Sequence, residues 1–138
     1  MAKLMKLHVV VPTLFLFLVA LLIGVAFAQQ NAIKRTMLQR QEFPGSQYVT
    51  VTGIAEIAPA GMAARHTHPG IENGYILEGE GNLKVQGQPE RMLKAGDSFQ
   101  VANTVPHSLR NLSNDKPLKV ISTWVVDKDK PLATPAPE

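Results

Sequence analysis

The sequence predicts a single all-β domain, built as a sandwich or barrel, behind an apolar N-terminal segment. The 138 residues are enough for one domain. From Tyr48 onward, apolar and polar residues alternate in short runs separated by Gly, Pro or Asn, which is the pattern of successive strands. No amphipathic pattern long enough for a three-turn helix follows residue 45. Many short strands without helices predict that the domain is a sandwich or barrel.

The first 28 residues have the features of a secretory signal peptide. Lys3 and Lys6 form a basic start, Val9–Phe27 is almost entirely apolar, and a small-x-small sequence ends at Ala28. We therefore expect cleavage after Ala28 and export to the periplasm or the extracellular space. The alternative is an uncleaved segment that anchors the protein in the membrane, because the apolar run is near the minimum length for crossing a bilayer.

The composition excludes several classes of function. Without the two lysines of residues 1–28, 12 of the 14 basic residues remain against 11 acidic ones. No basic run suggests nucleic-acid binding, and we expect no stable membrane association once the signal segment is cleaved. The chain has no cysteine, which excludes disulfides, thiol chemistry and thiolate metal ligands.

The elements follow in order after residue 28. Residues 29–47 are expected to form an N-terminal arm with room for one short strand, and residues 48–126 to form the barrel. In the first barrel strand, Val49, Val51, Ala55 and Ile57 share one face. Residues 127–138 are Pro-rich and are expected to be disordered or to lie on the surface. Further strands are expected over residues 64–68, 72–78, 81–86, 90–94, 97–101, 106–111 and 117–126.

The three histidines of the mature chain have the spacing of a metal site. His66 and His68 project from the same face of a strand, roughly 7 Å apart along the backbone. Glu72 keeps the same parity beyond a Pro-Gly bend, and His107 is the third histidine. Imidazole and carboxylate ligands suit one divalent transition metal, which the ligand types leave open among Fe, Mn, Ni, Co, Cu and Zn.

Two motifs carry a resemblance to a known family. The first has the spacing Gly, His-x-His, Glu, Gly and comprises Gly61, His66, His68, Glu72 and Gly79. The second comprises Gly96, His107 and Asn111. With these motifs the sequence resembles the cupin superfamily, and in particular a small single-domain cupin of the type-2 conserved-barrel kind, over roughly residues 48–126.

The sequence departs from the family pattern at two turns. Only four residues separate Gly61 from His66, which suggests a tighter turn before the ligand strand. Ala102 and Thr104 stand where the second motif usually has Pro and Gly, in the turn that presents His107. All four ligand positions of the family are nevertheless present.

The resemblance implies a double-stranded β-helix, or jelly-roll barrel, that holds one divalent metal through His66, His68, Glu72 and His107. Four protein ligands on a metal that takes six leave two positions for water, a substrate or another small ligand. Dimerisation is common in similar proteins, so the resemblance allows a homodimer.

Two further residues are candidates for supporting the metal ligands. Asn111 has the parity of His107 and would either fix a ligand or make a structural hydrogen bond. Arg65 precedes the ligand strand and would either meet an anionic substrate or form a solvated ion pair. Phe99, Val101, Ile76 and Trp124 are expected in the core or lining an apolar pocket.

The leading hypothesis for function is an exported, metal-dependent, oxygenase-like enzyme. The resemblance implies this activity on a phenolic or diketone-like molecule. One alternative is a non-catalytic module that binds or senses a metal or small ligand, and another is a Lewis-acid sugar or uronate isomerase. An isomerase would need an acid–base pair, but Glu56 has the polar parity and Glu78 and Glu80 lie in a turn.

Overall fold

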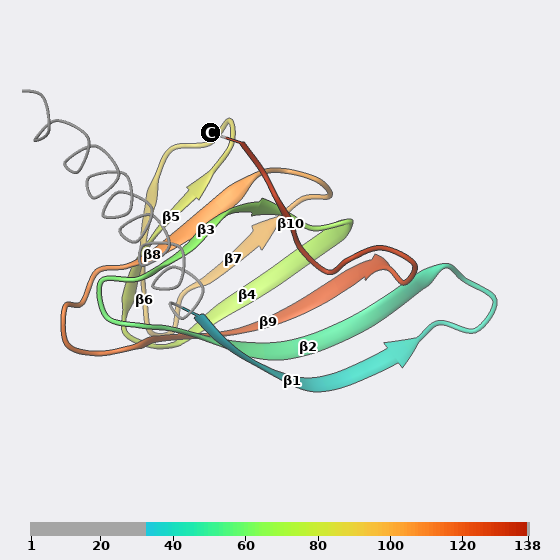
Figure 1. The fold of residues 1–138 in the computed structure, drawn as a ribbon, viewed down its shortest axis with the longest axis horizontal. Coiled ribbons are helices and arrows are strands. Elements are labelled where there is room, and N and C mark those ends of the chain that lie inside the picture. The colour runs from blue at the N-terminus through green and yellow to red at the C-terminus, as the bar shows by residue number, and fades with distance from the viewer. Residues whose placement is uncertain (1–32, 138) are drawn as a thin grey trace, which may run out of the picture. The chain divides into compact units, whose positions relative to one another are not determined.

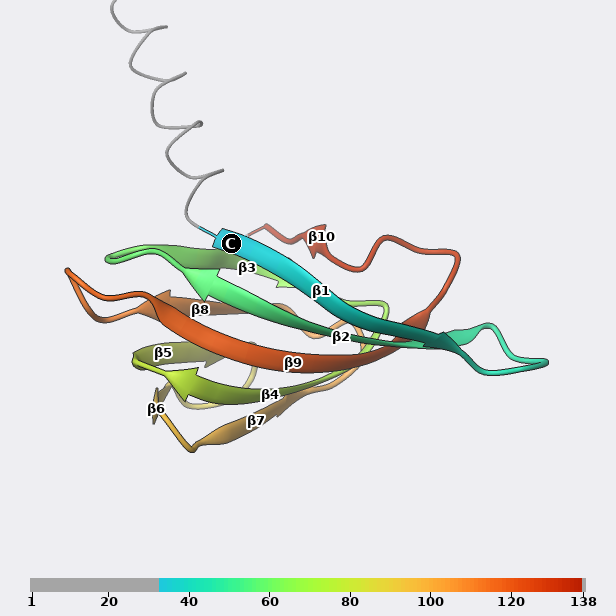
Figure 2. The same cartoon turned by 90° about the horizontal axis from the view of Figure 1, so that it is seen from below.

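The computed structural model describes residues 33–137, and they form two antiparallel five-stranded sheets (Figure 1). The strand order is β1-β2-β9-β4-β7 in the first sheet and β10-β3-β8-β5-β6 in the second. Figure 2 shows the sheets as two layers. The signal peptide and its cleavage after Ala28 lie outside the described residues. Within those residues, no helix is long and apolar enough to cross a membrane.

The strands of each sheet come from distant parts of the chain. The first sheet contains β1 (Ile33–Glu42), β2 (Tyr48–Ile57), β9 (Leu118–Asp127), β4 (Gly70–Glu78) and β7 (Ser98–Val101). The second contains β10 (Thr134–Pro135), β3 (Met62–Thr67), β8 (His107–Asn111), β5 (Glu80–Val85) and β6 (Arg91–Lys94).

The all-β prediction is confirmed, and the strands predicted between residues 64 and 126 lie within two residues of the observed ones. The face of β2 that was predicted to point inward is the buried one. Val49, Val51 and Ile57 are buried, while Tyr48 on the other face is exposed. Burial of one face fixes this register, since a slip of one residue would turn the apolar side chains outward. Most of the buried side chains form one cluster between the sheets, around Ile57, Ile76, Leu83 and Leu118.

The N-terminal arm is more ordered than the sequence predicted. Instead of one short strand, β1 runs for ten residues and pairs with β2 from Ile33↔Ile57 to Glu42↔Val49, with a bulge between Met37 and Gln39. The pattern concealed this strand because almost all of its residues are exposed, so no alternation of apolar and polar residues marks it. Its backbone partners come from β2, whose own pattern is clear.

The C-terminal tail runs back over β3. We call residues 128–137 the C-terminal strap. Within it, β10 pairs with β3 through Thr134↔Thr67 and Pro135↔His66, as Figure 1 shows. Leu132 packs against a second, smaller core cluster that includes Trp124. The strap therefore reaches the same end of β3 that carries the predicted metal ligands.

Candidate metal centre

The four predicted ligands converge from both sheets. His66 lies near the end of β3 and is in direct register with His107, the first residue of β8. His68 follows β3, and Glu72 projects from β4 in the opposite sheet. One ligand atom from each side chain lies within 4.8 Å of the other three. We call these four side chains the ligand cluster.

The cluster is tightly packed, and three of its four side chains are almost completely buried. The Nε2 atoms of His66 and His68 are 3.2 Å apart. Glu72 Oε2 lies 3.0 Å from His107 Nε2 and 3.1 Å from His68 Nε2. The exposed fractions of His68, Glu72 and His107 are only 5%, 6% and 3%. Polar groups buried to this extent require partners.

Backbone carbonyls fix the tautomer of all three rings. The Nδ1 atoms of His66, His68 and His107 lie 2.7, 2.6 and 3.1 Å from the carbonyl oxygens of residues 64, 132 and 105. A carbonyl oxygen only accepts, so each Nδ1 carries a proton and donates it. In a neutral ring the lone pair then lies on Nε2. All three Nε2 atoms point into the cluster.

This arrangement fits a metal ion. Three imidazole lone pairs and a carboxylate oxygen face one another at distances of about 3 Å, where they repel unless a cation or shared protons lie between them. Hydrogen bonds from ligand rings to backbone carbonyls are the usual outer contacts of histidine metal ligands. The donor set of three nitrogens and one oxygen suits a divalent transition metal.

The protonation of the cluster favours the same chemistry. Burial, together with the neighbouring His107, lowers the pKa of His66 to about 4. Burial alone would raise the pKa of Glu72, but hydrogen bonds from the side chains of His107 and His68, which share protons with the carboxylate when no cation lies between them, outweigh it and hold that pKa well below its usual range. At neutral pH, His66 is therefore uncharged and Glu72 is ionised, as metal ligation requires.

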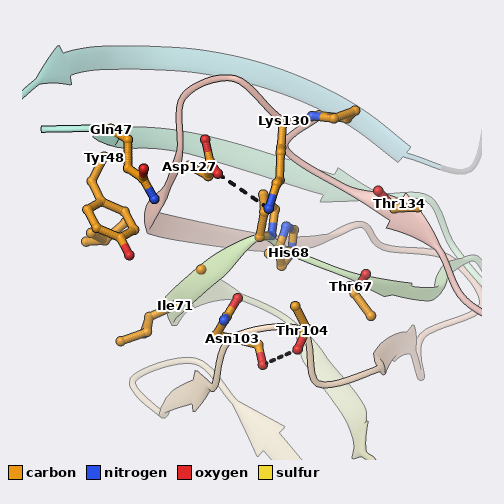
Figure 3. A pocket seen from close by; sticks show the side chains of 14 residues that line it. Gln47, Tyr48, Thr67, His68, Ile71, Asn103, Thr104, Asp127, Lys130 and Thr134 are labelled. Atoms are coloured by element: carbon orange, nitrogen blue, oxygen red, sulfur yellow. Dashed lines mark hydrogen bonds and ion pairs between the residues drawn. The ribbon is translucent and has the colours of Figure 1, made fainter.

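Two cavities meet at His68. The inner cavity has a volume of about 50 Å³ and is lined by the ligand cluster, by apolar core residues and by parts of β1 and the strap. The outer groove, of about 600 Å³, opens at the barrel mouth between the β4 start, the 103–104 turn and the strap. Figure 3 shows His68 and the Asp127–Lys130 ion pair at this groove.

The two supporting candidates have structural contacts. Asn111 is buried and its amide nitrogen donates to the carbonyls of Ile57, Ala58 and Lys116, while its oxygen accepts from the Ser113 N–H. Arg65 does not line the inner cavity. Its guanidinium donates to the carbonyl of Pro137 and to Gln86, and so ties down the strap.

Two contributors to the site, Arg35 and Leu132, were not predicted, whereas Phe99 and Trp124 were expected in the core or lining an apolar pocket. Trp124 and Phe99 line the inner cavity, and the indole N–H of Trp124 donates to His68 Nε2 at 3.3 Å. Arg35 lines the cavity from β1, in the segment treated as an arm. Leu132 reaches His68 through its backbone carbonyl. The alternation of apolar and polar residues in β9 predicts that Trp124 points inward. No pattern in the sequence predicts that Arg35 lines the cavity or that the Leu132 carbonyl contacts His68.

The unusual turn before His107 keeps a glycine-like backbone. Thr104 has a φ of 60°, in the left-handed region that glycine occupies freely. Its N–H donates to the carbonyl of His68, and the Val105 N–H donates to the carbonyl of Ala102. The turn is therefore retained at the position where the family pattern has Gly, and Thr104 carries the conformational cost.

We expect Thr104→Gly to stabilise the protein. A left-handed non-glycine residue costs about 1–2 kcal/mol, and the extra freedom of glycine in the unfolded chain offsets about 0.4–1 kcal/mol of that gain. The expected rise in the free energy of unfolding is about 0.5–1 kcal/mol, measured by urea denaturation. Thr104→Ala, which keeps the strained backbone, is the control. Equal free energies of unfolding for Thr104→Gly and Thr104→Ala would show that the backbone of Thr104 is not strained.

The comparison with protein families matches a cupin domain over residues 53–126. The chain belongs to the cupin family. The match covers both ligand motifs, and the two antiparallel sheets are the double-stranded β-helix expected of a cupin. In the comparison with curated proteins, nothing matches this cupin.

Solved structures share the fold. A DMSP lyase, DddQ from Ruegeria pomeroyi, has a TM-score of 0.64 and 22% identity over 78% of this chain and 53% of its own. An uncharacterised protein with a double-stranded β-helix domain from Klebsiella pneumoniae has a TM-score of 0.63 and 17% identity, covering 78% and 87%. An oxalate oxidase in complex with glycolate has a TM-score of 0.61 and 21% identity, covering 76% and 55%. The chain thus spans about half of the lyase and of the oxidase, and these similarities show the fold.

Proposed function

We propose that this cupin binds one divalent transition metal through His66, His68, Glu72 and His107 and acts on a small organic molecule. The observation that carries the proposal is the convergence of three Nε2 lone pairs and one carboxylate oxygen within 4.8 Å. A bound metal would supply Lewis-acid or redox chemistry at its remaining coordination positions. Fe, Mn, Ni, Co, Cu and Zn all accept this donor set.

Within this proposal we favour an oxygenase-like enzyme. The described part of the chain offers no carboxylate or histidine in the inner cavity outside the ligand cluster, so an acid–base pair of the kind an isomerase uses is missing there. Phenolic and diketone-like substrates would approach through the outer groove, since its volume of about 600 Å³ is typical of ligand pockets.

A second candidate is a non-catalytic module that binds a metal or a small ligand. The small inner cavity, of about 50 Å³, favours it. The strap also favours it, because Leu132 and Ala133 add apolar side chains to the lining of the cavity. A small apolar lining leaves room for a bound ion but restricts the entry of a substrate.

We also propose that the protein is exported. The proposal is supported by the order of basic, apolar and small residues in residues 1–28. A homodimer, which similar proteins suggest, stays a prediction.

Metal analysis of protein purified from its native compartment, followed by oxygen uptake, tests the function. We expect one metal ion per chain, and oxygen consumption by the Fe-, Mn- or Ni-loaded protein with a catechol or diketone. Metal binding without turnover of any compound would favour the binding module. Absence of stoichiometric metal would contradict the proposal as a whole.

A further inference from the structure

The inner cavity is too small for the organic molecule that the proposed function requires. Its volume is about 50 Å³, whereas most ligand pockets have roughly 300–1,000 Å³. The outer groove, of about 600 Å³, is large enough, but of the ligand cluster only His68 lines it. An organic molecule therefore reaches the other three ligands only if part of the wall of the inner cavity moves.

The C-terminal strap contributes to the walls of both cavities. Leu132 and Ala133 line the inner cavity. Lys130 and Thr134, on either side of them in the sequence, line the outer groove, and Figure 3 shows both residues beside His68. His68 also lines both cavities. Displacement of the strap would therefore join the outer groove to the inner cavity next to the metal ligands.

Few backbone contacts hold the strap in place. β10 is two residues long, the shortest of the described strands, and only two register pairs join it to β3. Pro131, Pro135 and Pro137 have no N–H to donate. Beyond β10, the Ala136 N–H donates to the carbonyl of Arg65 at 3.1 Å, and the Arg65 guanidinium donates to the carbonyl of Pro137 at 2.7 Å. A segment with so few contacts opens at a much lower free energy than the whole domain unfolds.

One of these contacts joins the strap to the ligand cluster. The Nδ1–H of His68 donates to the carbonyl of Leu132 at 2.6 Å. An acceptor at this position orients a ligating imidazole and raises its basicity, so the closed strap favours metal binding by His68. Coupling between two binding events is reciprocal, and a bound metal therefore favours the closed strap.

We propose that the strap is a gate, which opens to let metal and small molecules enter or leave the site and which holds His68 in its ligating orientation when closed. The inference rests on the proposed function and deepens it, because it assigns the route to the metal. Opening withdraws Leu132 and Ala133 from the wall of the inner cavity and removes the acceptor of the His68 Nδ1–H. The same movement widens the site and loosens one ligand.

A reversible disulfide across the strap tests the proposal. The chain has no cysteine, so the double variant Thr67→Cys/Thr134→Cys contains a single pair of thiols. The two positions are directly opposed in β3 and β10, and both line the outer groove. Opposed residues of antiparallel strands have Cα atoms about 4.5–5.5 Å apart, within the range of about 4.4–6.8 Å that disulfides span. Oxidation therefore locks the strap and reduction releases it.

The rate of cobalt release is the measurement. Cobalt-loaded protein is mixed with excess EDTA, and the loss of the visible absorption of bound Co²⁺ is followed. We expect the oxidised double variant to release cobalt about tenfold or more slowly than the same protein after reduction, because the disulfide removes the open state. Thr134→Cys alone, treated with the same oxidant, is the control and is expected to release cobalt at the rate of the wild type.

A second variant loosens the strap instead. Arg65→Gln removes the hydrogen bond to the Pro137 carbonyl, and we expect cobalt release to become about fivefold faster. Arg91→Gln is the matched control. Arg91 donates to the carbonyl of Ser98 at 3.1 Å, so this variant loses the same charge and a similar hydrogen bond away from the strap, and its release rate should not change.

The outcomes separate this inference from the proposed function. The cobalt content of every variant is measured first. If the wild type binds no cobalt, the proposed function fails and this inference fails with it. If cobalt binds but the oxidised and reduced double variants release it equally fast, this inference alone is overturned. If the double variant does not fold, Arg65→Gln decides, and release no faster than from Arg91→Gln overturns the inference.

Discussion

His107→Ala is expected to abolish stoichiometric metal binding while the barrel stays folded. His107 supplies one of four donors, and its Nε2 lies 3.0 Å from Glu72 Oε2, so its loss removes a ligand and a neighbour of the carboxylate. Loss of a mere outer-shell partner typically costs about 10–100-fold in metal affinity, and a direct ligand should cost more. Elemental analysis after equilibrium dialysis gives the metal content per chain.

Thermal unfolding supplies a second readout. Metal at about 100 times its dissociation constant stabilises a protein by about 2.7 kcal/mol, so added metal should raise the Tm of the wild type and not that of His107→Ala. Ser108→Ala, on the opposite face of β8, is the control and should behave like the wild type. Glu72→Gln keeps the side-chain volume and tests the site again if His107→Ala folds poorly. Equal metal content in wild type and both ligand variants would refute the site.

Gly70→Ala is expected to be among the most destabilising single-methyl additions in the domain. A Cβ at Gly70 would lie 2.0 Å from the carbonyl oxygen of Val125 and 2.7 Å from the Cα of Val126. Both are backbone atoms of β9, which pairs with β4 here, so no side-chain rotation relieves the clash. We expect a loss of about 3 kcal/mol, the upper end of the usual overpacking range, and a fall in Tm of about 12 °C or more.

The effect should extend to the metal centre, because Gly70 lies two residues before Glu72 on β4. Separating β4 from β9 moves the carboxylate relative to the histidines, so metal affinity should fall together with Tm. Gly87→Ala is the control. Its φ of +78° imposes strain of roughly 1–2 kcal/mol, but no neighbour lies within 4 Å. If Gly70→Ala were as stable as Gly87→Ala, β4 and β9 would be able to move apart at Gly70 without loss of unfolding free energy, and the prediction would be wrong.

The sequence was most informative where one face of a strand is buried. β2, β4 and β9 alternate buried and less buried residues along most of their length, so their apolar pattern predicted both their limits and their inward faces. β1 was expected only as one short strand in the N-terminal arm, because it is an edge strand whose residues are nearly all exposed. Its position depends on backbone pairing with β2, which side-chain patterns do not report.

The same distinction applies to the site. The convergence of the four ligands was predictable, since strand parity and motif spacing place His66, His68, Glu72 and His107 on inward faces. The surroundings of the cluster were not predictable. The place of Arg35 in the cavity lining depends on the full length of β1, of which only a short strand was expected. The contact of His68 with the strap joins residues 64 positions apart through a main-chain atom.

The carbonyls that orient the three imidazoles have a consequence for how this site could change during evolution. Every residue type has a carbonyl oxygen, so the side chains of Ala64, Val105 and Leu132 are free to vary without loss of these hydrogen bonds. What must persist is the path of the main chain at these three places. Natural substitutions at Ala64, Val105 and Leu132 could therefore leave the orientation of the three imidazoles unchanged. An alignment of related sequences would then show these positions as variable, although their main-chain positions are constrained.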